Sequence, residues 1–241
     1  MIGKGRLVER VRTGIEGFDE LIEGGLPRGR IYLVAGETGT CKTTFALQFL
    51  YMGARNFGES GIFVTIDEKP ERIIEDAASI GWDLEELIDQ NKLMILEISP
   101  FFSDIKEISA KRIAEELKLH IKQLNAKRLA IDPIAPLVLK EEEGGLRTQN
   151  VIRMYLKELF DSLEELNVTT IATSEIPTGT NTLSRYGVEE FLASGVIVLR
   201  LIREGTVFSR ELYVRKMRGV NHSLNAYPFV IQYGRGIVIS I

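Results

Sequence analysis

Residues 31–43 read Ile31-Tyr-Leu-Val-Ala-Gly-Glu-Thr-Gly-Thr-Cys-Lys-Thr43, an apolar run that leads into a loop containing two glycines. The apolar run predicts a buried strand, and the apolar-rich stretch from Thr44 to Tyr51 predicts a helix. A strand, a glycine-containing loop, Lys-Thr and a helix, in this order, are typical of a phosphate-binding loop. The backbone N–H groups of such a loop surround a polyphosphate, and the positive end of the helix adds to the attraction.

The loop supplies most of the candidate nucleotide-binding residues. Lys42 is expected to reach the β- and γ-phosphates of ATP, and the Thr43 hydroxyl is expected to ligate Mg²⁺. The second glycine of the usual pattern G-x-x-x-x-G-K-[ST] is replaced by Cys41, whose side chain narrows the backbone options. Its position beside Lys42 at a predicted helix N-terminus predicts a lowered thiol pKa. The candidate nucleotide-binding residues in the loop itself are Gly36, Glu37, Thr38, Gly39, Thr40, Cys41, Lys42, Thr43 and Thr44.

Composition limits the class of protein. The chain has 241 residues, 44% of them hydrophobic and 27% charged, which suits one globular domain over residues 1–241, with residues 1–11 as a flexible N-terminal segment. The one cysteine excludes an internal disulfide and is compatible with the cytoplasm. No apolar run approaches the ~20 residues of a membrane span, and the first residues lack the apolar core of a signal peptide. The net charge of −4 gives no general attraction for nucleic acid.

Strand and helix patterns alternate beyond the loop. Strands are predicted over residues 61–66, 92–98, 127–132 and 168–174, and helices over residues 70–80, 105–125 and 148–166. This alternation predicts an α/β fold with a mostly parallel, twisted sheet flanked by helices on both faces. Four further strands, with a hairpin tip at 203–206, predict an antiparallel extension of the same sheet over residues 195–202, 209–218, 227–232 and 236–241.

Acidic residues follow three of the predicted strands. Asp132 is expected to hold Mg²⁺ through water, although an acid at a strand end can also cap the next element. Asp67 and Glu68 could supply the carboxylate that activates the attacking water, or they could form a solvated turn. Glu175, with Thr173 before it, could sense the γ-phosphate or belong to a strand-end turn, and the sequence does not decide between the two.

A cationic group lies near the carboxyl terminus. In a strand, positions 212, 214, 216 and 218 share one face, so an apolar face would become cationic at Lys216 and Arg218, with His222 nearby. This arrangement suits a strand whose end points at an anion. A charged edge strand explains it equally well.

Several segments resemble, in order and nearly end to end, the KaiC-like ATPases of the RecA superfamily. The resemblance covers roughly residues 6–240. Besides the phosphate loop, it is carried by Arg12-Thr-Gly-Ile-Glu-Gly-Phe-Asp19, Gly81-Trp-Asp-Leu84, Arg185-Tyr-Gly-Val-Glu-Glu-Phe191 and Lys216-Met-Arg-Gly219.

This resemblance implies a RecA-type P-loop core and a homo-oligomer, a hexameric ring with ATP between neighbouring subunits. Lys216, Arg218 and His222 would then act in trans on phosphates held by the next subunit, as an arginine finger does. The family usually has Glu-Glu where this chain has Asp67-Glu68. Because Asp is shorter by ~1.5 Å, either Asp67 positions water poorly or Glu68 takes over the role. Asp67 in place of Glu and Cys41 in place of Gly are both departures from the family pattern, and together they predict slow hydrolysis.

Three functions are compatible with the sequence. The first is an ATP- and Mg²⁺-dependent ring that regulates an unidentified protein partner. The second is an ATPase like the RadA paralogues, acting on single-stranded DNA. Against it, the loop Glu141-Glu-Glu143 repels phosphates, and residues 176–187 offer only Arg185. The third is a scaffold that binds nucleotide without hydrolysing it.

Overall fold

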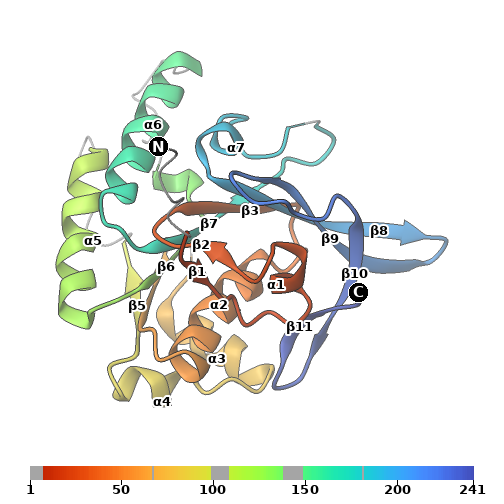
Figure 1. Ribbon diagram of the computed structural model, residues 1–241, viewed down its shortest axis with the longest axis horizontal. Helices are drawn as coiled ribbons and strands as arrows, with labels where there is room; N and C mark the ends of the chain where they lie inside the picture. Colours follow the sequence, from red (N-terminus) through yellow and green to blue (C-terminus); the bar gives the residue numbers. More distant parts are fainter. Residues whose placement is uncertain (1–7, 67, 99–108, 138–148, 181) are drawn as a thin grey trace, which may run out of the picture.

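A nine-stranded mixed sheet forms the centre of the computed structural model, which describes residues 8–66, 68–98, 109–137, 149–180 and 182–241 (Figure 1). Within these residues the strand order is β11-β10-β9-β8-β3-β7-β6-β4-β5. The central strand β3 (Ile31–Gly36) lies between β7 (Thr169–Glu175) and β8 (Gly195–Glu204), and both pairings are parallel.

The rest of the sheet divides into a parallel and an antiparallel part. On one side, β6 (Arg128–Asp132), β4 (Gly61–Thr65) and β5 (Leu93–Glu97) continue the parallel ladder. On the other, β9 (Val207–Met217), β10 (Ala226–Gln232) and β11 (Gly236–Ile239) are antiparallel. The predicted α/β fold, with antiparallel strands at the carboxyl-terminal end, is therefore confirmed.

Helices cover both faces of the parallel part, because β3 is apolar on both of its sides. Tyr32 and Val34 belong to the core with α2 (Lys42–Asn56), α3 (Pro70–Ser79) and α4 (Leu84–Asp89). Ile31, Leu33 and Ala35 belong to the opposite core with α5 (Ala110–Leu124) and α6 (Gln149–Glu164). None of the helices in the described ranges has the length and apolar character needed to cross a bilayer.

Several boundaries differ from those predicted. Helix α5 begins at Ala110 rather than at residue 105, because the Ser109 side chain accepts a hydrogen bond from the Arg112 N–H and caps the helix. The β8–β9 pairing continues to Glu204 and Val207, so the hairpin tip is shorter than residues 203–206. The acidic loop Glu141-Glu-Glu143 lies outside the described residues.

The amino-terminal segment contains elements that the sequence patterns did not predict. Strand β1 (Arg10–Val11) pairs with β2 (Leu26–Pro27), with the short helix α1 (Phe18–Leu21) between them. The segment expected to be flexible therefore forms a strand at residues 10 and 11, whereas residues 1–7 lie outside the described part. Helix α4 and the one-turn helix α7 (Glu189–Leu192) were not predicted either, since each is too short to show a period.

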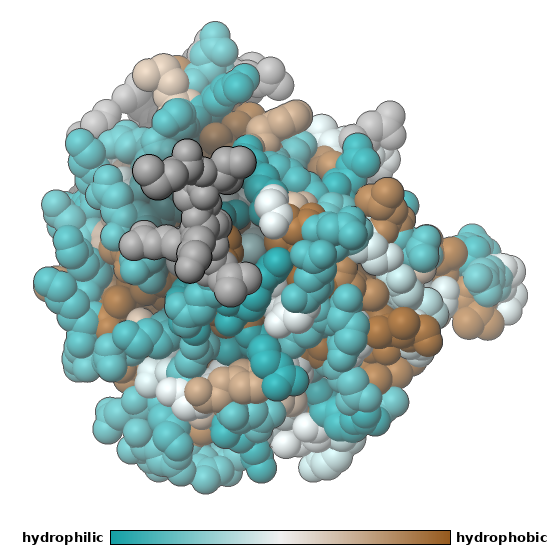
Figure 2. All heavy atoms as spheres, in the orientation of Figure 1, coloured by the Kyte–Doolittle hydropathy of each residue, from teal (hydrophilic) through white to brown (hydrophobic). Residues whose placement is uncertain are grey.

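The surface also distinguishes the two parts of the sheet. Figure 2 shows a largely hydrophilic face on which hydrophobic residues gather on the right, over the carboxyl-terminal strands. The exposed large apolar side chains of this region include Val207, Phe208, Leu224, Val230 and Ile241.

A buried cation ties the amino-terminal segment to the sheet and to α2. The Arg128 side chain is 1% exposed and forms a 2.7 Å ion pair with Glu59. Its Nη1 and Nη2 nitrogens donate to the carbonyl oxygens of Phe49 and Arg12, each at 2.8 Å. The helix leaves room for it only because residue 53 is glycine: a Cβ there would lie 2.5 Å from the Arg128 side chain. Burial lowers the pKa of Arg128, and Glu59 opposes that shift.

Replacing this cation should destabilise the fold. We expect Arg128→Met to lower the free energy of unfolding by about 3–5 kcal/mol, because two carbonyl groups and part of the Glu59 carboxylate lose their buried partner. Lys157→Met, which removes an exposed helical ion pair with Asp161, is the control and should cost below ~1 kcal/mol. Urea denaturation of both variants measures the difference, and equal losses would contradict the structural role assigned to Arg128.

Candidate nucleotide-binding site

A cavity of about 510 Å³ lies where the parallel strands reach their carboxyl ends. The register places Gly36 beside Glu175 and Thr65 beside Asp132, so four strand ends open on the same edge. The structure therefore brings together predicted residues that are up to about 140 positions apart in the chain. The cavity is lined by Thr38, Gly39, Cys41, Lys42, Thr43, Thr65, Glu68, Asp132, Pro133 and Glu175.

The loop is curled around the ammonium group of Lys42. The Glu37 carbonyl oxygen accepts hydrogen bonds from the Lys42 Nζ at 2.9 Å and from the Thr40 hydroxyl at 2.8 Å. Close packing requires glycine at residue 36, where a Cβ would lie 2.5 Å from the Thr40 hydroxyl. Residues 39 and 41 both have left-handed backbones, with φ of 82° and 74°. For Cys41 this conformation costs roughly 1–2 kcal/mol, a penalty that glycine avoids.

Charges of both signs meet in the cavity. Burial lowers the pKa of Lys42, and the nearby carboxylates of Asp132 and Glu175 oppose that shift. The Thr173 hydroxyl donates to the Asp132 carboxylate, and the Thr38 hydroxyl donates to Glu175 at 2.8 Å. The last contact links the phosphate loop directly to the end of β7.

Glu68 reaches the cavity through a tight turn after β4. The Thr65 hydroxyl donates to the Glu68 carbonyl oxygen at 2.7 Å and accepts from the Glu68 N–H at 3.2 Å. Asp67, the other candidate for the water-activating carboxylate, lies outside the described residues. Which of the two acids acts as the base therefore stays a prediction.

The oxygen donors of the cavity fit Mg²⁺. Thr43, with its hydroxyl, and Asp132, with its carboxylate, both line it. Mg²⁺ is usually held by one or two protein oxygens, with waters and substrate phosphates completing its octahedron. The described residues contain no group of three or more His, Cys, Asp or Glu that could hold a metal.

The environment of Cys41 contradicts the predicted thiol pKa. Burial raises the pKa of Cys41, and this effect outweighs Arg210 and Lys42, which lower it. The helix end and the neighbouring lysine suggested the opposite, because the sequence does not show how much water the fold removes from the thiol. The side chain is half-buried and packs against the core on the α2 face of the sheet.

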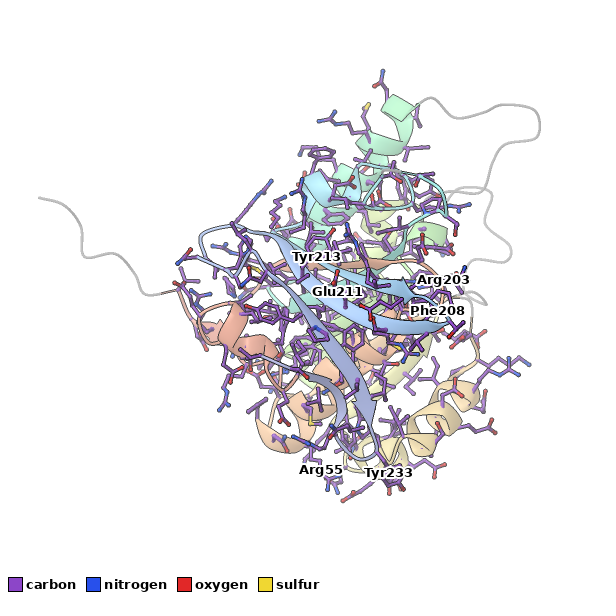
Figure 3. All side chains as sticks on the ribbon, turned by 90° about the vertical axis from the view of Figure 1, so that its right-hand side faces the viewer. Arg55, Arg203, Phe208, Glu211, Tyr213 and Tyr233 are labelled. Atoms are coloured by element: carbon purple, nitrogen blue, oxygen red, sulfur yellow. The ribbon has the colours of Figure 1, made fainter. Side chains whose placement is uncertain are left out.

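Arg210 is a residue of the site that the sequence analysis missed. It lies on β9, between Phe208 and Glu211, on the long hairpin in Figure 3. Its guanidinium lies close enough to the Cys41 thiol to lower the pKa of that thiol. The Nε of Arg210 is buried and has no hydrogen-bond partner among the described residues. Only the pairing of β8 with β3 brings this hairpin beside the loop, so no local pattern indicated the contact.

A second cavity of about 310 Å³ adjoins the first. The two share Thr43 and Glu68, and the second continues between α2 and α3 towards Ser79 and Asp76. Its walls are less charged than those of the first, with apolar side chains from Leu47 and Ile73.

The carboxyl-terminal cations are placed differently from the prediction. A β-bulge sets Val196 opposite Lys216 and Ile197 opposite Val214, so that Arg215 is the extra residue. The apolar face of β9 therefore continues from Val214 to Met217, and the prediction that Lys216 shares it is wrong.

These cations are held away from the loop of their own chain. The Lys216 Nζ donates to the carbonyl oxygens of Glu190, Phe191 and Ala193, at 2.9, 3.2 and 2.6 Å. Arg218 donates to the Phe191 carbonyl oxygen at 2.9 Å. The His222 ring is hydrogen-bonded to the Ser223 carbonyl at 2.9 Å. Lys216, Arg218 and His222 are absent from the linings of both cavities described above.

Comparison with known proteins gives one consistent result. A family profile described as "ATPase: KaiC" matches residues 11–241. The circadian clock oscillator protein KaiC of Parathermosynechococcus lividus is 40% identical over 229 residues, which are 94% of this chain and 41% of that protein. KaiC of Prochlorococcus marinus subsp. pastoris is 41% identical over 228 residues, covering 93% of this chain and 44% of that protein. The chain thus spans less than half the length of these relatives.

A solved structure agrees with the sequence relatives. The crystal structure of a KaiC-like protein from the hyperthermophilic archaeon Pyrococcus horikoshii superimposes with a TM-score of 0.84 at 42% identity. The match covers 98% of this chain and 100% of the other.

The position of Cys41 predicts how it reacts with thiol reagents. As the one cysteine of the chain, it can be labelled selectively. Because its pKa is raised, we expect alkylation at neutral pH to be slower in the native protein than in urea-unfolded protein, and to accelerate as pH rises. Adding MgATP should slow alkylation further, since Cys41 lines the cavity. Mass spectrometry gives the rates, and equal rates with and without MgATP would argue against a nucleotide beside this residue.

Proposed function

The chain belongs to the KaiC family of ATPases and has its RecA-type fold, and from this premise we propose that it binds and slowly hydrolyses ATP with Mg²⁺. One observation carries the proposal: the loop cation Lys42, the hydroxyl residue Thr43 and the acidic residues Glu68 and Asp132 all line a single cavity. These are the groups that phosphoryl transfer to water needs, because its catalysis consists mainly of positioning and charge stabilisation.

Each group has a distinct task in this proposal. The loop N–H groups and Lys42 hold the β- and γ-phosphates, and Lys42 leaves the Glu37 carbonyl to do so. Thr43 and, through water, Asp132 would hold Mg²⁺, which when bound neutralises charge on the phosphate oxygens. Asp67 or Glu68 accepts a proton from the attacking water. Glu175 would respond to the γ-phosphate through its contact with Thr38.

The adjoining cavity suits the nucleoside. It begins at Thr43 and extends away from Lys42 and Asp132 towards Ser79, between walls that are partly apolar. Arg210, beside Cys41, contributes a second cation from the same chain. Cys41 has a left-handed backbone at the position where the family pattern has glycine, and its side chain limits the conformations that the loop can adopt. This restriction supports slow turnover.

The cations Lys216 and Arg218 are proposed to complete the site of a neighbouring subunit in a hexameric ring, with His222 close to the same phosphates. In support, both side chains rest on the carbonyl groups that end α7 and not on the loop of their own chain. The exposed apolar residues over the carboxyl-terminal strands offer a surface for association (Figure 2).

We propose that the ring serves to regulate a protein partner by its nucleotide state. Action on single-stranded DNA is not favoured, because Arg185 is the one cation in residues 176–187 and the net charge is −4.

The two candidate bases can be separated by mutation. We expect Asp67→Asn to abolish ATP hydrolysis while ATP still binds, since an amide cannot accept the proton from water. Asp67→Glu should hydrolyse faster than the parent protein, because it restores the reach common in the family. Phosphate release and equilibrium nucleotide binding are the measurements. Loss of hydrolysis in Glu68→Gln alone would assign the base to Glu68 instead.

Sharing of the site between subunits can be tested by mixing two inactive variants. Lys42→Ala should fail to bind ATP, and Arg218→Ala should bind ATP but hydrolyse it roughly 10³–10⁵-fold more slowly, as expected for loss of an arginine finger. After subunit exchange, the mixture should regain activity, because some interfaces pair an intact loop with an intact Arg218. A mixture that exchanges subunits yet stays inactive would contradict the shared site.

A further inference from the structure

Glu189 is a completely buried carboxylate outside both cavities, with an exposed fraction of 0%. Its oxygens accept hydrogen bonds from the Ser184 hydroxyl at 2.7 Å, the Val188 N–H at 3.1 Å and the Tyr186 N–H at 3.3 Å. A fourth donor is the Ser174 hydroxyl, also at 3.3 Å. All four donors are neutral. Glu189 forms no ion pair with any cationic side chain of the described residues.

Such a carboxylate fixes the structure around it. A buried charge is tolerated only when hydrogen bonds replace its lost hydration, so the donors must stay in place. Three of them belong to residues 184–188, which lead into α7, and the fourth belongs to β7. Glu189 therefore determines where the single turn of α7 lies relative to the sheet.

The other end of α7 holds the two cations proposed to act in trans. The carbonyl oxygens of Glu190, Phe191 and Ala193 accept three hydrogen bonds from Lys216, and the Phe191 oxygen also accepts one from Arg218. Glu189 itself begins this turn. Any shift of Glu189 moves the carbonyl groups on which both cations rest.

The same carboxylate also connects α7 to the nucleotide site of its own chain. Ser174, which donates to Glu189, precedes Glu175, and Glu175 accepts a hydrogen bond from Thr38 in the phosphate loop. The Arg185 N–H donates to the Ser174 hydroxyl at 3.0 Å, which fastens the loop before α7 to β7 a second time. One strand thus carries the contacts of both the loop and the base of α7.

We propose that Glu189 is a positioning residue for the trans site: it sets α7, and through α7 the placement of Lys216 and Arg218 towards the next subunit. This inference rests on the proposed function of that pair. A residue that only stabilised the fold would affect nucleotide binding in its own subunit as much as the cations offered to the neighbour. The two roles therefore predict different results in mixed rings.

The experiment places Glu189→Gln in one subunit type at a time. In the mixture of Lys42→Ala and Arg218→Ala, the first protein donates the cations and the second holds ATP. Glutamine is nearly isosteric, but its amide nitrogen cannot accept from Ser184 or from the backbone N–H groups. With Glu189→Gln in the donor, ATP hydrolysis should fall roughly 10–100-fold, as expected for cations displaced by about 1 Å. With Glu189→Gln in the acceptor, the fold-decrease in ATP hydrolysis should be at least ten times smaller than with the same change in the donor.

Two further variants keep the result interpretable. Glu190→Gln in the donor is the matched control: it removes the neighbouring carboxylate, which accepts from the Ser184 hydroxyl and lies near Lys216, but it leaves the backbone donors of Glu189 in place. Its loss of ATP hydrolysis should be smaller than that of Glu189→Gln. Ser184→Ala removes a hydroxyl that Glu189 shares with Glu190 and leaves both charges unchanged. It should reproduce the donor-specific loss in weaker form if Glu189→Gln folds poorly.

The outcomes separate the inference from the function on which it rests. A fall confined mainly to the donor supports the positioning role. Equal falls in donor and acceptor, for both Glu189→Gln and Ser184→Ala, would overturn that role and leave the shared site intact. An inactive parent mixture, despite demonstrated subunit exchange, would overturn the shared site and the inference with it.

Discussion

Burial of β3 on both of its faces is the constraint on which the rest of the structure depends. A strand covered by helices on each side can present chemistry only at its ends, and in a parallel sheet the carboxyl ends of neighbouring strands meet at one edge. The loop after Gly36 consequently lies at the edge where β4, β6 and β7 end, at Thr65, Asp132 and Glu175. The cavity is a product of this arrangement, since its lining residues come from the ends of β4, β6 and β7, the loop after β3 and the start of α2.

The cations of the chain fall into two groups with different orientations. Lys42 and Arg210 face the phosphate loop of their own chain, the first from α2 and the second from the hairpin that pairs beside β3. Lys216 and Arg218 belong to the same strand region as Arg210, but the bulge at Arg215 and the carbonyl groups of α7 hold them elsewhere. One β-bulge thus separates cations for the subunit itself from cations proposed for its neighbour.

Two buried charges outside the cavity support this division. Arg128 joins β6 to the amino-terminal segment and to α2, the helix that begins with Lys42. Glu189 joins β7 to α7, on whose end Lys216 and Arg218 rest. Each is expensive to bury, and each is surrounded by hydrogen-bond partners from segments far apart in the chain. Both sides of the proposed catalytic interface are therefore fixed by interior polar contacts, while apolar packing fills the rest of the core.

The sequence by itself determined the phosphate loop, the alternation of strands and helices, and the antiparallel end of the sheet, because these follow from local periodicity and from residue types at fixed spacing. It also indicated Glu68, Asp132 and Glu175 as strand-end acids, which the structure places around one cavity. Only the tertiary structure decided the pKa of Cys41, which depends on burial, and the contact of Arg210, which depends on strand order. It likewise decided that Lys216 leaves the apolar face of β9, because a bulge is set by pairing between strands and leaves no period in the chain.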